Sequence, residues 1–260
     1  MGLAAALAAA TIAVTPASFL QSHQGADGSF AEANGTGSPE LTAWAALGLR
    51  ASRASTGNAL SYLASHEGEV TTPTSIALVA LAQSALGRGP DALLARLPVR
   101  PRAVNAAVWH ILALRQARRR VARTLVTYVL RSQARNGGFS WSRGLQPDSN
   151  DTAFAIQALR SAGVRGKPVL RAVAYLRGFQ RKDGGFELAR GRGSDAQSTA
   201  VAIQGFVAAR VKPPAGAFRY LAALRRADGS YRYSARYAAT PVWVTSQVLP
   251  ALARKALPLR

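Results

Sequence analysis

An acidic loop at residues 146–151 carries the side chains best suited to chemistry. The stretch QPDSNDTAFAIQAL (146–159) places Asp148 and Asp151 on either side of Asn150, directly before an apolar run. A carboxyl whose pKa is raised by burial or by a neighbouring carboxylate can hold a proton at neutral pH and donate it as a general acid. The same residue types also cap helix N-termini by accepting hydrogen bonds from free backbone N–H groups. The stretch therefore predicts either an acid site or a helix cap.

A second copy of this loop helps to separate the two interpretations. DAQSTAVAIQGF begins at Asp195, 47 residues after Asp148. A position that recurs in a repeat usually serves packing, so Asp148 and Asp195 are predicted to be helix caps. Asp151 has no acidic counterpart, because the equivalent residues are Leu41, Pro73, Val104, Ser198 and Val244. Asp151, with Asp148 and Asn150 beside it, is therefore the best candidate for a catalytic group.

These loops belong to a repeat that runs through the chain. Six apolar segments share a register, marked by one polar anchor each: Thr42, Thr74, Asn105, Thr152, Thr199 and Thr245. An amphipathic segment precedes each apolar one, and in four units a glycine turn such as QRKDGGF (180–186) lies between them. Periods of this length indicate repeat architectures. We predict an all-α (α/α)6 toroid of about six helical hairpins over residues 18–260, with the apolar helices around a central cavity.

Aromatic residues on or just before the apolar segments are candidates for lining that cavity. They are Trp44, Trp109, Trp141, Phe154 and Trp243. Aromatic faces attract cations, and core packing is the alternative interpretation. Asp195 is added as a polar candidate for the same ligand site.

The composition limits the classes of partner. The chain has 33 Lys and Arg against 12 Asp and Glu, a formal net charge of +21. This excess favours an anionic membrane or cell-wall surface, although scattered charges can also simply solvate outer helices. The densest basic run (117–123) has no interleaved aromatics, so no nucleic-acid partner is predicted. The absence of cysteine excludes thiolate zinc sites, and neither a metal nor a cofactor is expected.

The first residues suggest export. MGLAAALAAATIAVTPA (1–17) is an apolar run that ends in small residues, although it lacks a basic start. We predict a secretory signal segment over residues 1–17, with cleavage after Ala17, and a secreted or extracytoplasmic protein. The alternative is an ordinary Ala-rich helix in a cytoplasmic or membrane-peripheral protein.

The turn and the helix start together resemble a known family. The pattern QxxDGSF or QxxDGGF, followed by DxxxTAxAIQ, resembles the terpenoid cyclase and protein prenyltransferase toroid family, and most of all its squalene–hopene cyclase side. The resemblance covers nearly all of the chain after residue 18. It implies an α/α toroid that holds an apolar, isoprenoid-like ligand in its central cavity.

The resemblance also implies a reaction and an alternative to it. In the cyclases, a D-x-D-D-T-A loop starts a metal-free polyene cyclisation, and its middle aspartate is the acid. The matching loop here is DSNDTA, which puts Asn150 at the acid position and leaves Asp148 and Asp151 as the carboxyls. The zinc ligands of the prenyltransferases include a cysteine, which this chain lacks. The same toroid also serves corrinoid (cobalamin) carriers, so a secreted, non-catalytic ligand-binding module is the alternative.

Overall fold

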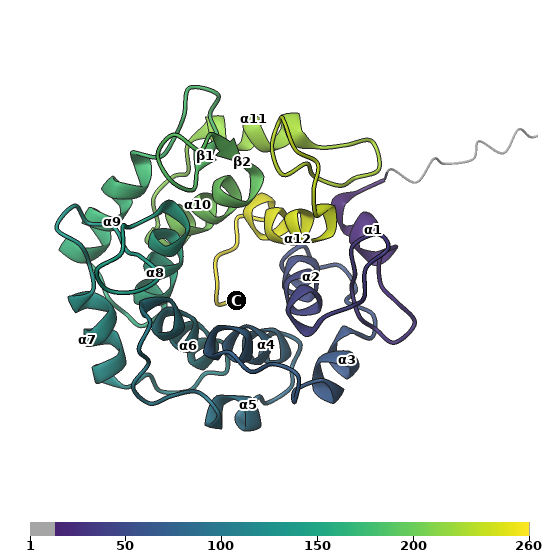
Figure 1. Ribbon diagram of the computed structural model, residues 1–260, viewed down its shortest axis with the longest axis horizontal. Coiled ribbons are helices and arrows are strands. Elements are labelled where there is room, and N and C mark those ends of the chain that lie inside the picture. Colours follow the sequence, from purple (N-terminus) through teal and green to yellow (C-terminus); the bar gives the residue numbers. More distant parts are fainter. Residues whose placement is uncertain (1–13, 260) are drawn as a thin grey trace, which may run out of the picture.

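The computed structural model describes residues 14–259 and shows a ring of paired helices (Figure 1). The inner helices are α2 (Pro39–Ala51), α4 (Pro73–Ala85), α6 (Val104–Gln116), α8 (Ser149–Ser161), α10 (Ala196–Ala209) and α12 (Pro241–Leu252). The outer helices are α1 (Pro16–Gln21), α3 (Ala59–Ser65), α5 (Asp91–Ala95), α7 (Arg123–Arg131), α9 (Lys167–Arg177) and α11 (Ala215–Leu224). Two short strands, β1 (Phe186–Glu187) and β2 (Ser194–Asp195), pair antiparallel before α10. The predicted all-α toroid of six hairpins is confirmed.

The inner and outer helices differ in burial, as their sequences predict. In α10, ten of the eleven residues from Ala196 to Phe206 are buried, Gln197 being the exception, whereas in α7 only Leu125 and Val129 are buried. An inner helix has neighbours on every side, so it is apolar nearly all round. An outer helix contacts the ring along one stripe and exposes its charged residues to solvent.

The ring closes between the first and last units. Helix α12 packs against α2 and α1 (Figure 1). Glu32, in the loop before α2, accepts hydrogen bonds from the backbone N–H groups of Val242 (3.0 Å) and Trp243 (2.8 Å) at the start of α12. Arg225 donates to the carbonyl oxygen of Val14 at 2.8 Å. These contacts bring the two ends of the repeat together.

The recurring threonine satisfies a buried backbone group. Its Oγ1 accepts the N–H of the aromatic residue that ends each glycine turn, at 2.8–3.0 Å: Phe30 to Thr42, Phe139 to Thr152, Phe186 to Thr199 and Tyr231 to Thr245. A buried N–H without a partner is costly, so turn and threonine recur together. The turn itself needs glycine at Gly184, because its φ is +90° and an added Cβ would lie 2.6 Å from the carbonyl oxygen of Gly216.

The structure corrects the repeat register in the second and third units. The threonine anchor is the fourth residue of α2, α8 and α10 and the fifth of α12, whereas the predicted anchors Thr74 and Asn105 are the second residues of α4 and α6. Ile76 and Ala107 occupy the fourth position instead. These two units have no glycine turn, so no buried N–H requires a threonine there. The marker on which the sequence alignment depended is therefore missing from them.

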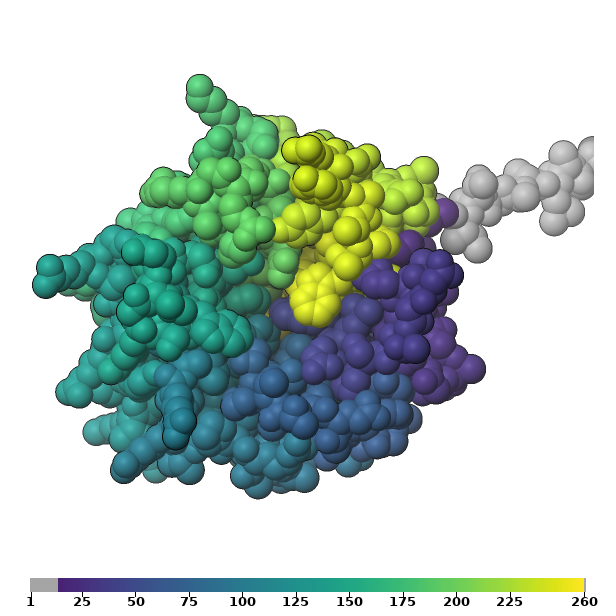
Figure 2. Space-filling model, viewed as in Figure 1, coloured from purple at the N-terminus to yellow at the C-terminus, as the bar shows by residue number. Residues whose placement is uncertain are grey.

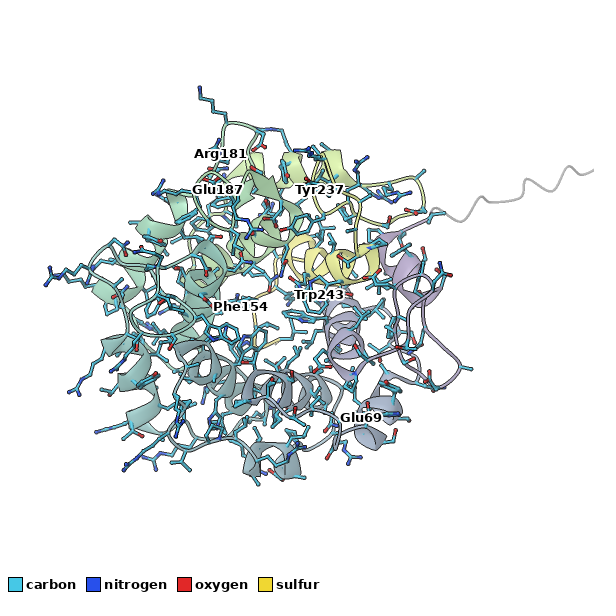
Figure 3. All side chains as sticks on the ribbon, in the orientation of Figure 1. Glu69, Phe154, Arg181, Glu187, Tyr237 and Trp243 are labelled. Atoms are coloured by element: carbon cyan, nitrogen blue, oxygen red, sulfur yellow. The ribbon has the colours of Figure 1, made fainter. Side chains whose placement is uncertain are left out.

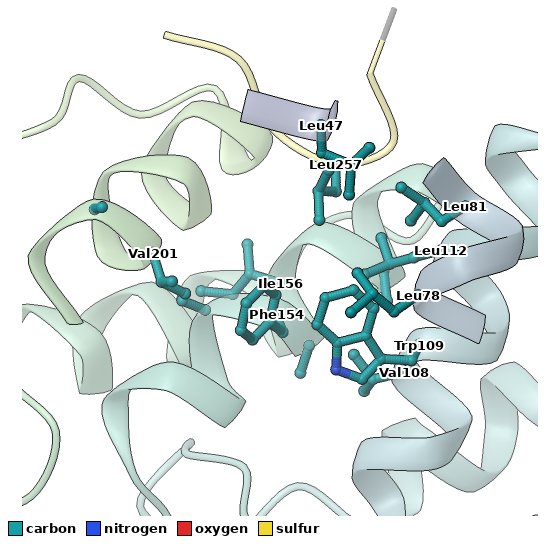
Figure 4. Close-up of a cluster of buried hydrophobic side chains, with 14 of the residues drawn as sticks. Leu47, Leu78, Leu81, Val108, Trp109, Leu112, Phe154, Ile156, Val201 and Leu257 are labelled. Carbon is teal, nitrogen blue, oxygen red and sulfur yellow. The ribbon is translucent and has the colours of Figure 1, made fainter. Parts of the chain in front are cut away.

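The C-terminal segment enters the ring and helps to fill its centre (Figures 1 and 4). Leu257 is 3 % exposed and belongs to the main hydrophobic core. Its N–H donates to the side-chain oxygen of Gln157 on α8 at 2.8 Å. Gln116, the last residue of α6, donates to the carbonyl oxygen of Leu259 at 3.2 Å. The segment thus closes the ring at the end where the inner helices end.

The predicted signal segment overlaps the folded unit. Residues 1–13 lie outside the described residues. Thr15 is the N-cap of α1 and accepts the N–H of Ser18 at 3.0 Å, so a cut after Ala17 would fall within the first turn of this helix. No helix in residues 14–259 combines the length and apolar character needed to span a bilayer. Export stays a prediction.

Candidate functional site

Three inner helices meet at the predicted acid loop. Asp148 is the N-cap of α8, and its Oδ1 accepts the N–H of Asp151 at 2.8 Å. The Oδ1 of Asp151 accepts a hydrogen bond from Nδ2 of Asn105 on α6 at 2.8 Å. The Oγ1 of Thr74 on α4 donates to Oδ1 of Asn105 at 3.0 Å. A chain of hydrogen bonds therefore fixes Asp151 at the end of the ring where the inner helices begin.

The environment of Asp151 favours its protonated form. Burial raises the pKa of Asp151 to about 7, and repulsion from Asp148 adds to the rise. The hydrogen bond from Asn105 opposes it, because it stabilises the carboxylate. Burial also raises the pKa of Asp148, although the N–H of Asp151 opposes this rise. At neutral pH the protonated form of Asp151 is therefore populated to a substantial degree.

Asn150 lies between the two carboxyls but supplies no acid. Its side chain is half-buried, and its Oδ1 accepts a hydrogen bond from Oγ of Ser149 at 3.3 Å. An amide cannot donate a proton to an alkene at useful rates, so Asp148 and Asp151 are the carboxyls of this loop that can act.

Asp195 is a helix cap, as predicted from the repeat. It is 4 % exposed at the N-cap of α10, where its Oδ1 accepts the N–H of Ser198 at 2.6 Å. Oγ of Ser198 donates to the other carboxylate oxygen at 2.8 Å. Burial raises the pKa of Asp195, and both hydrogen bonds from Ser198 oppose the rise. Because both oxygens are paired within the same turn, the side chain is held by its own helix.

Four of the five candidate aromatic residues meet in the middle of the ring. The ring centroid of Trp44 lies 5.5 Å from that of Trp109, 6.3 Å from Phe154 and 6.1 Å from Trp243. Phe154 and Trp243 both project towards the centre in Figure 3. Trp44, Trp109 and Phe154 are 4–7 % exposed, whereas Trp243 is half-buried. On the face shown in Figure 2, yellow atoms of the C-terminal part of the chain partly cover the middle of the ring.

Trp141 lies outside this cluster. Its side chain is 52 % exposed, on the loop that precedes α8, and its carbonyl oxygen accepts the N–H of Asn105 at 3.0 Å. The sequence placed it near an inner helix, but seven residues of loop separate it from the first residue of α8. Its backbone thus supports the acid site while its ring faces solvent.

Two features of the ring were not predicted from the sequence: Asn105 as the partner of Asp151, and Gln247 as a fully buried polar residue of α12. Trp44 and Phe154 each follow their anchor threonine by two residues, and Gln247 follows Thr245 by the same spacing. This shared spacing was therefore a sequence signal that groups Gln247 with Trp44 and Phe154. No local pattern indicated that Asn105 and Asp151 meet across 46 residues of sequence.

The two ends of the ring differ in charge. A cavity of about 760 Å³ lies where α2 and α4 end, and its charged lining residues are Arg50, Arg53, Arg118 and Lys255. The acid pair lies at the opposite end, where the inner helices begin. Within residues 14–259, no group of three or more His, Asp or Glu side chains is arranged to hold a metal ion.

Comparison with known proteins identifies the fold. No protein-family model and no curated protein matches the chain. An ent-copalyl diphosphate synthase from Streptomyces platensis is similar in structure, with 21 % identity and a TM-score of 0.58 over 83 % of this chain. This chain spans only 50 % of that synthase.

Two other solved structures match over almost their whole length. A protein from Actinoplanes is 17 % identical with a TM-score of 0.64, over 92 % of this chain and 97 % of that one. A type II terpene cyclase from Scytonema, in complex with its substrate geranylgeranyl dihydroxybenzoate, is 14 % identical with a TM-score of 0.64, over 92 % of this chain and 95 % of that one. The chain therefore has the α/α-toroid fold of the terpenoid cyclases.

Proposed function

We propose that this protein binds an apolar, isoprenoid-class molecule against the central aromatic cluster, and that protonated Asp151 donates a proton to it. The observation that carries the proposal is the acid pair at the end of an aromatic-lined ring, where Asp151 has a pKa of about 7 and is fixed by Asn105. The Scytonema cyclase, which acts on an isoprenoid substrate, supports it, because a single toroid of similar length suffices there.

The proposed chemistry is an isomerisation. The proton of Asp151 would move to a terminal alkene carbon, and the resulting cation would close on a second alkene within the same molecule. The faces of Trp44, Trp109 and Phe154 would stabilise the positive charge. Loss of a proton from a carbon atom would then complete a product of unchanged mass. A carboxyl with a pKa of about 7 is a weak acid towards an alkene, so we expect slow turnover.

Asn150 favours a second candidate, a non-catalytic carrier of the same class of ligand. In a carrier, protonated Asp151 would donate a hydrogen bond and no carbon–carbon bond would form. The fold and the aromatic cluster are equally compatible with a cyclase and with a carrier. Product formation is therefore the measurement that separates them.

We also propose that the ligand reaches the ring from an anionic membrane surface. Three large apolar side chains are exposed on two loops beside the acid site: Val99 (83 %), Trp141 (52 %) and Leu145 (56 %). Tyr128 connects these loops, because it donates to the carbonyl oxygen of Arg102 at 2.6 Å and lies 4.5 Å below the guanidinium of Arg143. Exposed tryptophan and aliphatic groups among arginines suit a charged bilayer interface.

Incubation with a pool of polyprenoids tests the first two functions. The purified chain is mixed with linear polyprenyl hydrocarbons and alcohols, and the retained compounds are identified by chromatography and mass spectrometry. A new peak at the mass of an input compound supports cyclisation. An unchanged compound retained in stoichiometric amount supports the carrier. Retention of nothing contradicts both.

Sedimentation with vesicles tests the membrane surface. We expect binding to vesicles that contain phosphatidylglycerol, weak binding to pure phosphatidylcholine, and loss of binding in the double variant Trp141→Ser/Leu145→Ser. The exposed pair Leu170→Ser/Tyr237→Ser, which lies on other parts of the chain, serves as the control. Equal binding by both double variants would contradict the assigned surface.

A further inference from the structure

A buried glutamine in the ring has no partner. Gln247 on α12 is fully buried, and within residues 14–259 neither its side-chain oxygen nor its nitrogen has a hydrogen-bond partner. Native proteins pair nearly all buried polar side chains, because an unpaired amide loses its bonds to water without replacement. A fully orphaned amide in the core therefore calls for a ligand group or a bound water molecule.

The repeat places this amide at the centre. Trp44 and Phe154 follow their anchor threonines by two residues, and both belong to the central aromatic cluster. Gln247 follows Thr245 by the same two residues. It also lies one helical turn after Trp243, whose ring contacts Trp44. Its position in the repeat and its position one turn after Trp243 both place the amide of Gln247 on the side of the aromatic cluster.

A second amide lies beside it. Gln204 on α10 is 1 % exposed, and its Nε2 donates to the backbone carbonyl oxygen of Gln247 at 3.3 Å. Its Oε1 has no partner among the described residues. Leu81 on α4 and Leu112 on α6 belong to the apolar cluster shown in Figure 4. Gln204 and Gln247, which both have unpaired amide atoms, therefore lie on neighbouring inner helices, α10 and α12.

We infer that Gln247, with Gln204, binds a neutral hydroxyl group of the ligand. A hydroxyl both donates and accepts, so it can pair with the free oxygen and the free nitrogen of Gln247. A hydrocarbon would leave both unpaired. A diphosphate would be buried there without a cation, because the residues at the equivalent position of the six inner helices are Trp44, Leu78, Trp109, Phe154, Val201 and Gln247. The inference rests on the proposed function and makes the ligand a prenyl alcohol or phenol instead of a plain polyene.

Access to this group requires side-chain movement. The rings of Trp44, Trp109 and Phe154 contact one another, and each is almost fully buried. Trp243, which is half-buried, lies at the start of α12 on the side of the acid loop. A ligand would enter by displacing these aromatic side chains. Its hydroxyl end would enter the helical ring first.

Binding of two matched ligands tests the inference. Equilibrium binding of geranylgeraniol and of the C20 hydrocarbon that lacks its hydroxyl is measured by tryptophan fluorescence. We expect the wild type to bind the alcohol at least about tenfold more tightly. Gln247→Leu should remove this preference without weakening hydrocarbon binding. The same change should raise the thermal unfolding midpoint by about 2–4 °C, because it removes an unpaired amide.

The control is another fully buried glutamine. Gln83 on α4 donates to the carbonyl oxygen of Leu63 at 3.0 Å and to Glu67 at 2.9 Å, so Gln83→Leu should lower the unfolding midpoint and leave the alcohol preference unchanged. If Gln247→Leu fails to fold, Gln204→Leu tests the same preference. Equal wild-type affinity for both ligands would overturn the inference and leave the proposed function standing. Binding of neither ligand would overturn both.

Discussion

The starts of α8 and α10 share one backbone arrangement and differ in one side chain. In both, an aspartate caps the helix and accepts the N–H of the residue three positions later. In α10 that residue is Ser198, whose hydroxyl donates back to Asp195. In α8 it is Asp151, whose pKa rises to about 7 because the carboxyl is buried and because Asp148 repels its negative charge. The position of the cap is therefore structural, and the third residue after it decides whether the turn also holds an acid.

This difference shows how a repeat can acquire a reactive group without losing its fold. The cap and the anchor threonine stay the same in both units. Asp151 gains a partner from outside its own unit, Asn105 on α6, whereas Asp195 is satisfied within its own turn. Variants that make one turn resemble the other, or that remove a group from one turn at a time, should therefore separate effects on stability from effects on function.

The largest expected effect concerns the proposed reaction. Asp151→Asn removes the carboxyl but keeps the size of the side chain, so product formation should fall at least about 100-fold. Asp195→Asn, the matched change in α10, should leave it within about twofold. Chromatographic measurement of product per enzyme gives both values. Equal losses in the two variants would mean that α8 has no special acid.

The next effect is on the pH dependence of stability. The folded-state pKa of Asp151 is raised, so the folded protein holds this proton more tightly than the unfolded chain. Its destabilising contribution is absent below about pH 4 and grows as the pH rises to about 7, to at most about 4 kcal/mol. Asp151→Ser copies the arrangement in α10, so most of this pH-dependent loss of stability should disappear. Urea unfolding at pH 4 to 8 measures the free energy of unfolding for both proteins.

Ser198→Asp is the reciprocal test of the same point. It places a second carboxyl beside Asp195, and this variant should lose stability between about pH 4 and 7 more steeply than the wild type. An unchanged pH profile in both variants would contradict the account of the two turns.

Removing each cap should have a smaller effect. Asp195→Ala should lower the free energy of unfolding by about 1–2 kcal/mol, because it removes the cap and leaves the Ser198 hydroxyl buried without its acceptor. Asp148→Ala should cost less at pH 8, because loss of the cap is offset by relief of the repulsion on Asp151. Denaturant unfolding at pH 8 compares them. A larger loss for Asp148→Ala would show that the two carboxyls do not repel each other.

The smallest expected effect comes from the partner of Asp151. Asn105→Ala removes a hydrogen bond that stabilises the carboxylate, so the pKa of Asp151 should rise further. The midpoint of the pH dependence should then move upwards, by less than about one pH unit. Carboxyl NMR titration of the two proteins measures it directly. A downward shift would mean that Asn105 does not bond to the charged form.

Most of the fold could be predicted from the sequence, because the repeat consists of short local patterns. The glycine turns, the amphipathic and apolar segments and the caps Asp148 and Asp195 each follow from short-range patterns that recur. The register of α4 and α6 did not follow, because these units lack the turn that marks it. Trp141 was grouped with the central aromatics because distance along the chain was the available guide, and the loop carries it to the surface.

The sequence by itself determined six helical hairpins and the identity of the capped turns, because helix periodicity, glycine turns and N-caps depend on neighbours within a few residues. The tertiary structure alone decided which polar groups meet between units. Asn105 reaches Asp151, Glu32 caps α12, and the buried side chain of Gln247 finds no hydrogen-bond partner within residues 14–259. Such contacts depend on how the ring closes, since closure brings together side chains that are remote along the chain. The pKa of Asp151 was decided in the same way, because burial depends on every helix around it.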